Sequence, residues 1–140
     1  MGRIMAIDYG ARRVGIAVTD PEQIIASPVA TIDSKDLFSF LKEYTSREVV
    51  AQIVLGYPLK EDGTDTDLTR PVDRLLKQLK ESFPEINFSK HDERYTSKLA
   101  MQAMIEGGAS KKARRKKSNL DLISATIILQ SYMEEKNLSS

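Results

Sequence analysis

The sequence predicts an α/β fold in which helices pack on a mixed β-sheet. It opens with three apolar segments of strand length joined by short turns, and strands then alternate with helices. The predicted order is βββαβαβαα, in which the first three strands form an antiparallel meander. A chain of 140 residues with no low-complexity linker is expected to form one domain, residues 1–140.

The first three strands lie before residue 33. Residues 3–8, RIMAID, are apolar on both alternating faces, as in a central strand covered on two sides. The letters YGAR are typical of a turn, and VGIAVTD at 14–20 forms the second strand, so the chain opens with a β-hairpin. A third strand is predicted near residues 24–32, interrupted or at a sheet edge because it contains Pro28.

A helix and a buried strand follow. Ser34 is placed to cap a helix that runs to about residue 44, with Leu37, Phe38 and Leu41 on its inner face. Residues 51–58, AQIVLGYP, are typical of a short buried strand, and the polar residues after them of a loop.

The second half alternates helix and strand. A helix is predicted from about Thr69, because Pro71 fits only a first turn, and it ends before residue 84. The letters EINFSKHDER at 85–94 supply another strand, and Thr96 is expected to cap a helix that stops at Gly107. The last helix is predicted over about 119–136, with apolar positions that include Leu120, Ile123, Ile127 and Met133.

Composition excludes several chemistries. The sequence has no cysteine, which rules out disulfides, thiolate nucleophiles and cysteine-bound zinc. Its one histidine argues against a Ser-His-Asp triad and rules out a histidine-rich metal site. No segment resembles a secretory signal or a membrane-spanning helix, so the sequence predicts a cytoplasmic protein without a membrane partner.

Positive charge is concentrated in one run. The net charge is only +1, and the chain outside this run is mildly acidic. Such a basic stripe favours a polyanionic partner, although a run of this kind is also compatible with a solvated surface loop. The run consists of Lys111, Lys112, Arg114, Arg115, Lys116 and Lys117.

Asp8 ends an otherwise apolar strand. Burying an ionised carboxylate costs several kcal/mol unless a partner compensates it. The candidate partners are Arg12, Arg13, the amides of the turn and a metal ion. The alternative is that Asp8 is an ordinary turn residue that opens the hairpin.

Two later acids are candidates for the same site. Glu93 follows a predicted strand, at the sheet edge where ligands of α/β proteins usually bind, but it is also compatible with an ordinary charged loop. Asp121 lies in the first turn of the last helix, where Ser118-x-x-Asp121 matches a capping box. Its neighbours Ser124 and Ala125 on the same helical face are small, which favours a carboxylate directed towards the sheet.

Taken together, the three acids favour a metal site. They can all be placed at one edge of one sheet, and converging carboxylates require a cation to remain ionised. Mg²⁺ prefers such oxygen ligands, and Mn²⁺ is the alternative. One or two of these ions can activate water and bind both reacting oxygens of a phosphodiester.

Four segments resemble successive blocks of the YqgF/RuvX family, in the family's order and over nearly the whole chain. They read IDYGARRVGIAVTD, VLGYPLKEDGT, DERYTSKLA and LDLISATIILQSY. Members are described as Holliday junction resolvases or as nucleases that mature pre-16S ribosomal RNA. The resemblance implies an RNase H-like fold, with a five-stranded mixed sheet flanked by helices.

The resemblance also implies site residues. A divalent metal would be bound by Asp8, Glu93 and Asp121, which would also be the catalytic residues. Nucleic acid would be contacted by Arg13, Gly56, Arg94 and the basic run. The implied partners are pre-16S rRNA or branched DNA, and ribosome-assembly intermediates, for a monomer or a homodimer.

Three classes of function stay open at this point. The first is a metal-dependent nuclease, hydrolysing phosphodiester bonds of pre-16S rRNA or of a Holliday junction. The second is a non-catalytic nucleic-acid-binding factor of ribosome assembly. The third is a nucleotide-binding protein, because DYGARRVG is similar to the phosphate-binding hairpin of actin-like ATPases, which use two such domains.

Overall fold

The computed structural model describes residues 2–58, 60, 62–92 and 117–139, and in the last helix the side chains of residues 122–136. The helix expected between Thr96 and Gly107 lies outside these residues. Every other predicted strand and helix is present, within a few residues of its expected bounds.

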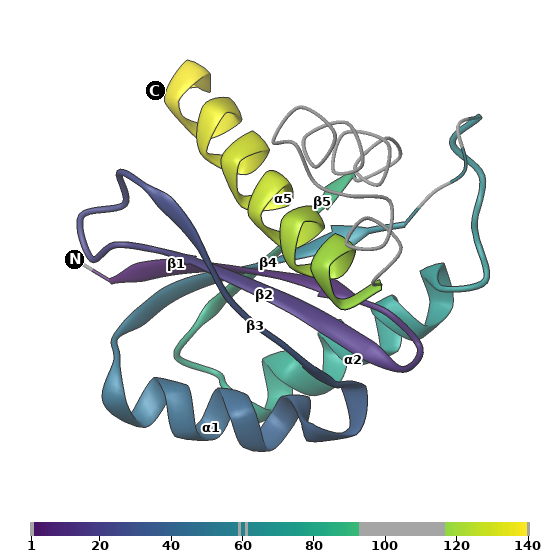
Figure 1. Ribbon diagram of the computed structural model, residues 1–140, viewed down its shortest axis with the longest axis horizontal. Coiled ribbons are helices and arrows are strands. Elements are labelled where there is room, and N and C mark those ends of the chain that lie inside the picture. The colour runs from purple at the N-terminus through teal and green to yellow at the C-terminus, as the bar shows by residue number, and fades with distance from the viewer. Residues whose placement is uncertain (1, 59, 61, 93–116, 140) are drawn as a thin grey trace.

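A five-stranded mixed sheet forms the centre of the molecule (Figure 1). Its spatial order is β3-β2-β1-β4-β5. The chain pairs β1 with β2 and β2 with β3 in antiparallel fashion, and β1 with β4 and β4 with β5 in parallel. This confirms the predicted mixed sheet with an antiparallel meander, whose third strand lies at an edge. The strands are β1 (Arg3–Tyr9), β2 (Arg13–Thr19), β3 (Ala26–Asp33), β4 (Val50–Tyr57) and β5 (Asn87–Asp92).

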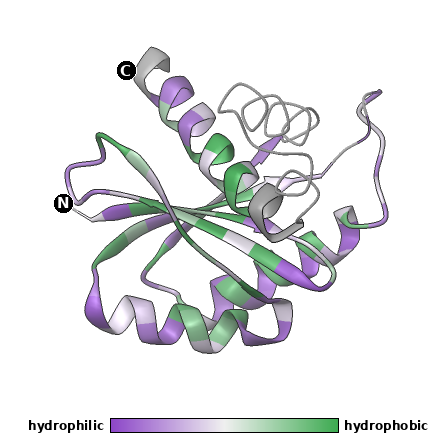
Figure 2. Cartoon of the chain, in the orientation of Figure 1, coloured by the Kyte–Doolittle hydropathy of each residue, from purple (hydrophilic) through white to green (hydrophobic). Residues whose placement is uncertain are grey.

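Helices cover both faces of the sheet. Helices α1 (Leu37–Arg47) and α2 (Thr69–Ser82) lie on one face, and α5 (Lys117–Ser139) crosses the other (Figure 1). A short 3₁₀ helix, η1 (Ser34–Asp36), precedes α1. Hydrophobic residues concentrate on the strands between these layers (Figure 2).

The alternation of β1 decides which layer each of its residues meets. Met5 and Ile7 join the larger hydrophobic cluster under α1 and α2. Ile4 and Ala6 join the smaller cluster under α5. Because alternate residues of a strand face opposite sides, Asp8 continues the Ile4 and Ala6 series and lies on the α5 face.

The inner faces of two helices differ from the expectation. Ser34 does not cap a long helix: its hydroxyl donates to the Ala11 carbonyl at 2.9 Å, and α1 begins only at Leu37. Phe38, predicted to face inward, is 36% exposed, whereas Tyr44 is buried. In a helix that begins two residues later than predicted, residues 37, 41 and 44 form the inner stripe at the i, i+4, i+7 spacing.

The last helix is longer than predicted, and its buried stripe is different. The residues that pack on the sheet are Ala125, Ile128 and Leu129, joined by the buried Ser124. Ile123 and Ile127, singled out in the sequence as apolar, are only half-buried. The apolar residues of α5 are not confined to one side of the helix, so the sequence leaves its inner face undecided, and here the small residues allow it to approach the sheet.

The turn between β1 and β2 depends on a glycine. The Gly10 amide donates to the Arg13 carbonyl at 2.8 Å and closes the turn. A Cβ atom added to Gly10 would lie 2.7 Å from that carbonyl oxygen. The backbone approach that positions the end of β1 is therefore available only to a residue without a side chain.

We expect Gly10→Ala to lower the free energy of unfolding by about 1–3 kcal/mol, because the added methyl overpacks the turn. Urea unfolding followed by circular dichroism measures this difference. Ala11→Ser is the matched control, because Ala11 is exposed in the same turn and should change stability little. A Gly10→Ala variant as stable as the wild type would contradict the interpretation.

Asp20 organises the loop between β2 and β3. Its carboxylate accepts backbone hydrogen bonds from Ile25 at 2.7 Å, Ile24 at 2.8 Å and Glu22 at 3.1 Å. The bond from Ile25 is the largest cause that holds the pKa of Asp20 below its usual value, and those from Ile24 and Glu22 act in the same direction. The loop is thus bonded specifically to the ionised form of Asp20.

We expect the stability advantage of the wild type over Asp20→Asn to depend on pH. The pKa of Asp20 is lower in the folded protein than in the unfolded chain, where it is near 3.8. The stability advantage is therefore fully present at pH values above the unfolded pKa, and it is lost as the pH falls through the folded pKa. Urea unfolding of both proteins at pH values from about 6 to about 2, the range in which carboxylates titrate, measures the difference in their free energies of unfolding. A difference that stays constant across this range would show that the charge of Asp20 does not matter.

Candidate active site

Three parallel strands end at the same edge of the sheet. Asp8, Tyr57 and Asp92 lie at or beside the carboxyl ends of β1, β4 and β5. Helix α2 begins at this edge, because the Thr69 hydroxyl donates to the Pro58 carbonyl at 2.6 Å. The first turns of α5 lie at the same edge (Figure 1). This is the edge at which α/β sheets usually bind ligands.

Asp8 occupies the middle of a row that runs across the sheet. It pairs with Gly15 of β2, which in turn pairs with Thr31 of β3. On the other side, Gly56 follows Leu55, the partner of Ile7, and therefore takes the position beside Asp8 in β4.

Both lateral neighbours of Asp8 are thus glycines. The next residues on the same face of the three strands are Ala6, Ala17 and Val54, each two positions away from the row. All three belong to the cluster under α5, so the row faces α5. Neither glycine contributes a side chain that would cover the carboxylate from within the sheet. Asp8, which is half-buried, is therefore flanked within its row by backbone without side chains.

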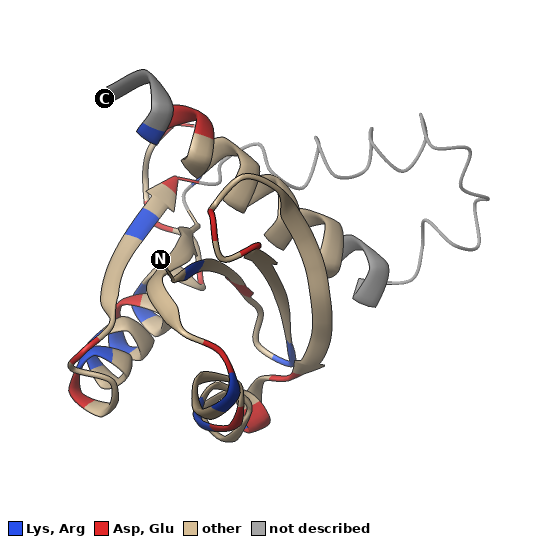
Figure 3. Cartoon of the chain, turned by 90° about the vertical axis from the view of Figure 1, so that its left-hand side faces the viewer, with Lys and Arg blue, Asp and Glu red and all other residues tan. Residues whose placement is uncertain are grey.

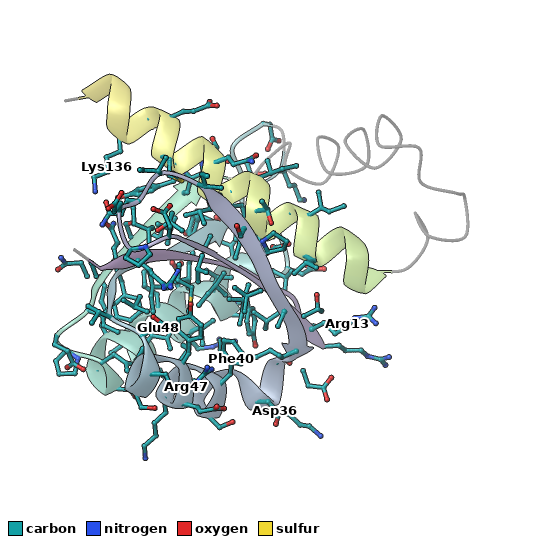
Figure 4. The ribbon with its side chains drawn as sticks, turned by 60° about the vertical axis from the view of Figure 1, so that its left-hand side comes forward. Arg13, Asp36, Phe40, Arg47, Glu48 and Lys136 are labelled. Atoms are coloured by element: carbon teal, nitrogen blue, oxygen red, sulfur yellow. The ribbon has the colours of Figure 1, made fainter. Side chains whose placement is uncertain are left out.

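Arg13 lies on the same face. It begins β2 at the hairpin end of the sheet (Figure 4), and it belongs to the odd-numbered series with Gly15 and Ala17. Its side chain is half-buried. The structure therefore places Asp8, Arg13 and Gly56, three of the predicted site residues, on one face at one edge.

The backbone of α5 brings Asp121 towards this face. Ser124 and Ala125, one turn further along the helix, are buried against the sheet. Helix α5 packs mainly across β1, β2 and β3, the strands that surround Asp8. The position of residue 121 at the start of the helix is thus described, whereas its side chain is not.

His91, which the sequence analysis did not assign to the site, connects β5 to α5. It pairs with Gly56 in the sheet and is only 8% exposed. Its Nε2 atom lies 2.9 Å from the Ser131 hydroxyl and its Nδ1 atom 3.4 Å from a Glu135 carboxylate oxygen. The Tyr132 ring lies edge-on to it at 6.3 Å between ring centroids. In the sequence, only the alternation of strand residues could have indicated that His91 faces inward. No feature of the sequence indicated its partners on α5.

The other predicted site residues lie outside the described part of the chain. Glu93 and Arg94 directly follow the last residue of β5. The basic run is likewise outside it, except for Lys117, whose backbone begins α5. Within the described residues, no three His, Cys, Asp or Glu side chains come together as a metal-binding group. Asp8 supplies a carboxylate of the kind that Mg²⁺ prefers, at the edge where the chain continues to Glu93.

Comparisons with known proteins identify the family of this chain. The model of the RuvX family, described as "Holliday junction resolvase", matches residues 2–135. A protein of Amoebophilus asiaticus named "Putative pre-16S rRNA nuclease" is 50% identical over 133 residues, which cover 95% of this chain and 94% of that protein. A protein of the same name from Christiangramia forsetii is 44% identical over 135 residues, covering 96% of this chain and all of its own length.

The fold also has a counterpart among solved structures. RuvC of Thermus thermophilus in complex with a Holliday junction substrate superposes with a TM-score of 0.57, at 14% identity, covering 97% of this chain and 96% of that one. Its likeness identifies the fold as RNase H-like, as the resemblance implied. Among the described helices, none is long and apolar enough to span a membrane. From the family match and the near full-length relatives, we conclude that this chain belongs to the RuvX family.

Proposed function

We propose that this protein is a cytoplasmic, metal-dependent nuclease of one domain that processes the 5′ end of pre-16S rRNA during ribosome biogenesis. The observation that carries the proposal is the position of Asp8, at the end of the central strand, between two glycines and on the face covered by α5, which carries Asp121 near its start. The names of the relatives support the reaction and the substrate. The metal dependence is supported by the chemistry of the acids.

In this proposal the metal ligands, and the catalytic residues, are Asp8, Glu93 and Asp121. Strand β5 directs Ser89 and His91 towards α5, as the contact of His91 with Ser131 indicates. Glu93 is the second residue after His91 in the sequence, and we assign it to the same site as Asp8.

The chain's own residues would position the substrate. Asp8, on a central strand, provides a rigid reference for the reacting phosphate. Gly56 allows the backbone to approach closely, and Arg13 offers a guanidinium to a neighbouring phosphate. Arg94 and the basic run, Lys111–Lys117, would contact the nucleic-acid backbone further away. A bound Mg²⁺ or Mn²⁺ would supply an activated water and neutralise charge on the phosphate.

A cleavage assay tests the proposal. The wild type is incubated with pre-16S rRNA and with a four-way DNA junction, each with Mg²⁺, with Mn²⁺ and with EDTA, and Asp8→Asn serves as the blank. Metal-dependent cleavage of the RNA is the expected result. Absence of cleavage in both substrates, with binding retained, would instead identify a non-catalytic assembly factor.

The second candidate function is resolution of Holliday junctions. It is favoured by the description of the family and by the RuvC fold. Cleavage of the junction and not of the RNA in the same assay would establish it. Symmetric cleavage of a junction also requires two active sites, so this outcome would be accompanied by a homodimer in solution.

A further inference from the structure

We propose that the outer face of α2 is a second nucleic-acid-binding surface, which holds the sugar-phosphate backbone of a substrate arm that extends from the active-site edge. The surface consists of Arg70, Arg74 and Lys77, and we call it the α2 stripe. It is distinct from the residues assigned above to nucleic-acid contact. The inference rests on the proposed function, because it assumes a nucleic-acid substrate.

The α2 stripe lies opposite the buried face of its helix. Arg70, Arg74 and Lys77 follow the i, i+4, i+7 spacing that places side chains on one line along a helix. All three are exposed, whereas Val72 and Leu79 on the other side are fully buried. Figure 3 shows basic residues along this helix.

The geometry of the line suits a phosphate backbone. The three positions span about 10 Å along the helix axis, at about 1.5 Å per residue. Successive phosphates of one strand advance by about 3.4 Å along a duplex axis, so this span matches about three phosphates. The line begins in the first turn of α2, at the edge where β1, β4 and β5 end.

The three cations are available to a ligand. Within the part of the chain that the structure describes, none of them takes part in an ion pair or a side-chain hydrogen bond. The acid between them, Asp73, is already engaged: it accepts from the Tyr57 hydroxyl at 3.1 Å and lies 3.6 Å from Lys90. Its charge is therefore compensated on the side of the helix that faces β4 and β5.

Helix stability argues that the stripe has another role. Cations are unfavourable in the first turn of a helix, where the macrodipole is positive. Helix α2 nevertheless has Arg70 in its first turn, no acid there and no side-chain cap from Leu68. Arg70 thus gains nothing from its own helix, whereas the dipole and Arg70 act together on an anionic partner at this end of the stripe.

Salt-dependent binding of a labelled RNA hairpin in EDTA tests the inference, since cleavage does not interfere without metal. The test variant carries Arg70→Gln, Arg74→Gln and Lys77→Gln. The control carries Lys35→Gln, Lys42→Gln and Arg47→Gln, which removes three exposed charges from η1 and α1 on the same side of the sheet. Each phosphate contact contributes about 0.9 to the slope of log K against log salt in a duplex.

The expected result is a slope shallower by about 2 to 3 for the α2 variant, binding weaker by roughly tenfold or more, and little change in the control. The melting temperature of Arg70→Gln alone should be unchanged or higher, which excludes a folding defect. Equal losses in both variants would show an effect of net charge and overturn the inference, as would unchanged binding in the α2 variant.

The outcomes separate this inference from the proposed function. If the α2 variant binds like the wild type while Asp8→Asn abolishes cleavage, the nuclease function stands and the α2 stripe does not bind its substrate. If the wild type binds neither the RNA hairpin nor a four-way DNA junction at low salt, both proposals fail. The Asp8→Asn variant tests cleavage, and it is not used in the comparison of salt-dependence slopes.

Discussion

Asp8→Asn is expected to lower metal-dependent cleavage at least about 100-fold, because even the loss of a partner behind a metal ligand costs 10- to 100-fold. The exchange is nearly isosteric, so the hairpin and the sheet should form as before. A variant that unfolds cooperatively and binds RNA but does not cleave it is the predicted outcome. Single-turnover cleavage measures the rate, and calorimetric titration with Mn²⁺ measures metal binding independently of activity.

The matched control for this prediction is Asp36→Asn. Asp36 is an exposed aspartate beside the start of α1, on the other side of the sheet from the Asp8 row (Figure 4). Its replacement should leave both cleavage and metal binding unchanged. Glu93→Gln and Asp121→Asn should behave like Asp8→Asn. Full activity in any two of these three acid variants would falsify the three-acid site.

Ile128→Ala is expected to lower the free energy of unfolding by about 2–5 kcal/mol, the usual range for truncating a fully buried aliphatic side chain. Ile128 is completely buried in the smaller cluster, where α5 meets Ile4, Ala6 and Val54. That cluster holds fewer residues than the one under α1 and α2. Truncating one side chain there therefore removes a larger share of the hydrophobic contacts between α5 and the sheet.

Leu41→Ala is the comparison for this prediction, because Leu41 is equally buried in the larger cluster. Both variants should lose similar global stability in urea. Only Ile128→Ala should speed hydrogen exchange in α5 beyond the global loss, and only it should weaken Mn²⁺ binding at temperatures where the protein stays folded. Equal metal affinity in the two variants would show that the packing of α5 on the sheet does not affect metal binding at the proposed site.

The sequence was sufficient for the order and type of the elements. Apolar letters on both faces of residues 3–8 identified β1 as central, and the sheet order confirms it. Pro28 indicated that the third strand is interrupted or lies at an edge, and β3 is an edge strand with a register shift beside Pro28. These features follow from local rules, since strand alternation and the missing amide of proline act wherever the segment lies.

The sequence was less successful where two faces of a helix compete. Phe38 was expected inside and is exposed, because the inner stripe of α1 runs through Leu37 and Leu41 and Phe38 lies about 100° around the helix from Leu37. In α5, Ile123 and Ile127 are only half-buried, and the buried stripe includes Ser124 and Ala125 instead. Such choices depend on how closely a helix can approach the sheet, which is a property of both surfaces together.

For the site, the sequence by itself determined which chemistry is available. Without cysteine and with one histidine, carboxylates are the groups left for a predicted metal site, and the quoted blocks predict Asp8, Glu93 and Asp121 as its ligands. Only the tertiary structure decided that Asp8 lies on the α5 face between Gly15 and Gly56, and that His91 joins β5 to α5. The reason is physical: residue types are local, whereas the neighbours of a side chain depend on strand register and helix docking, which join segments far apart in the chain.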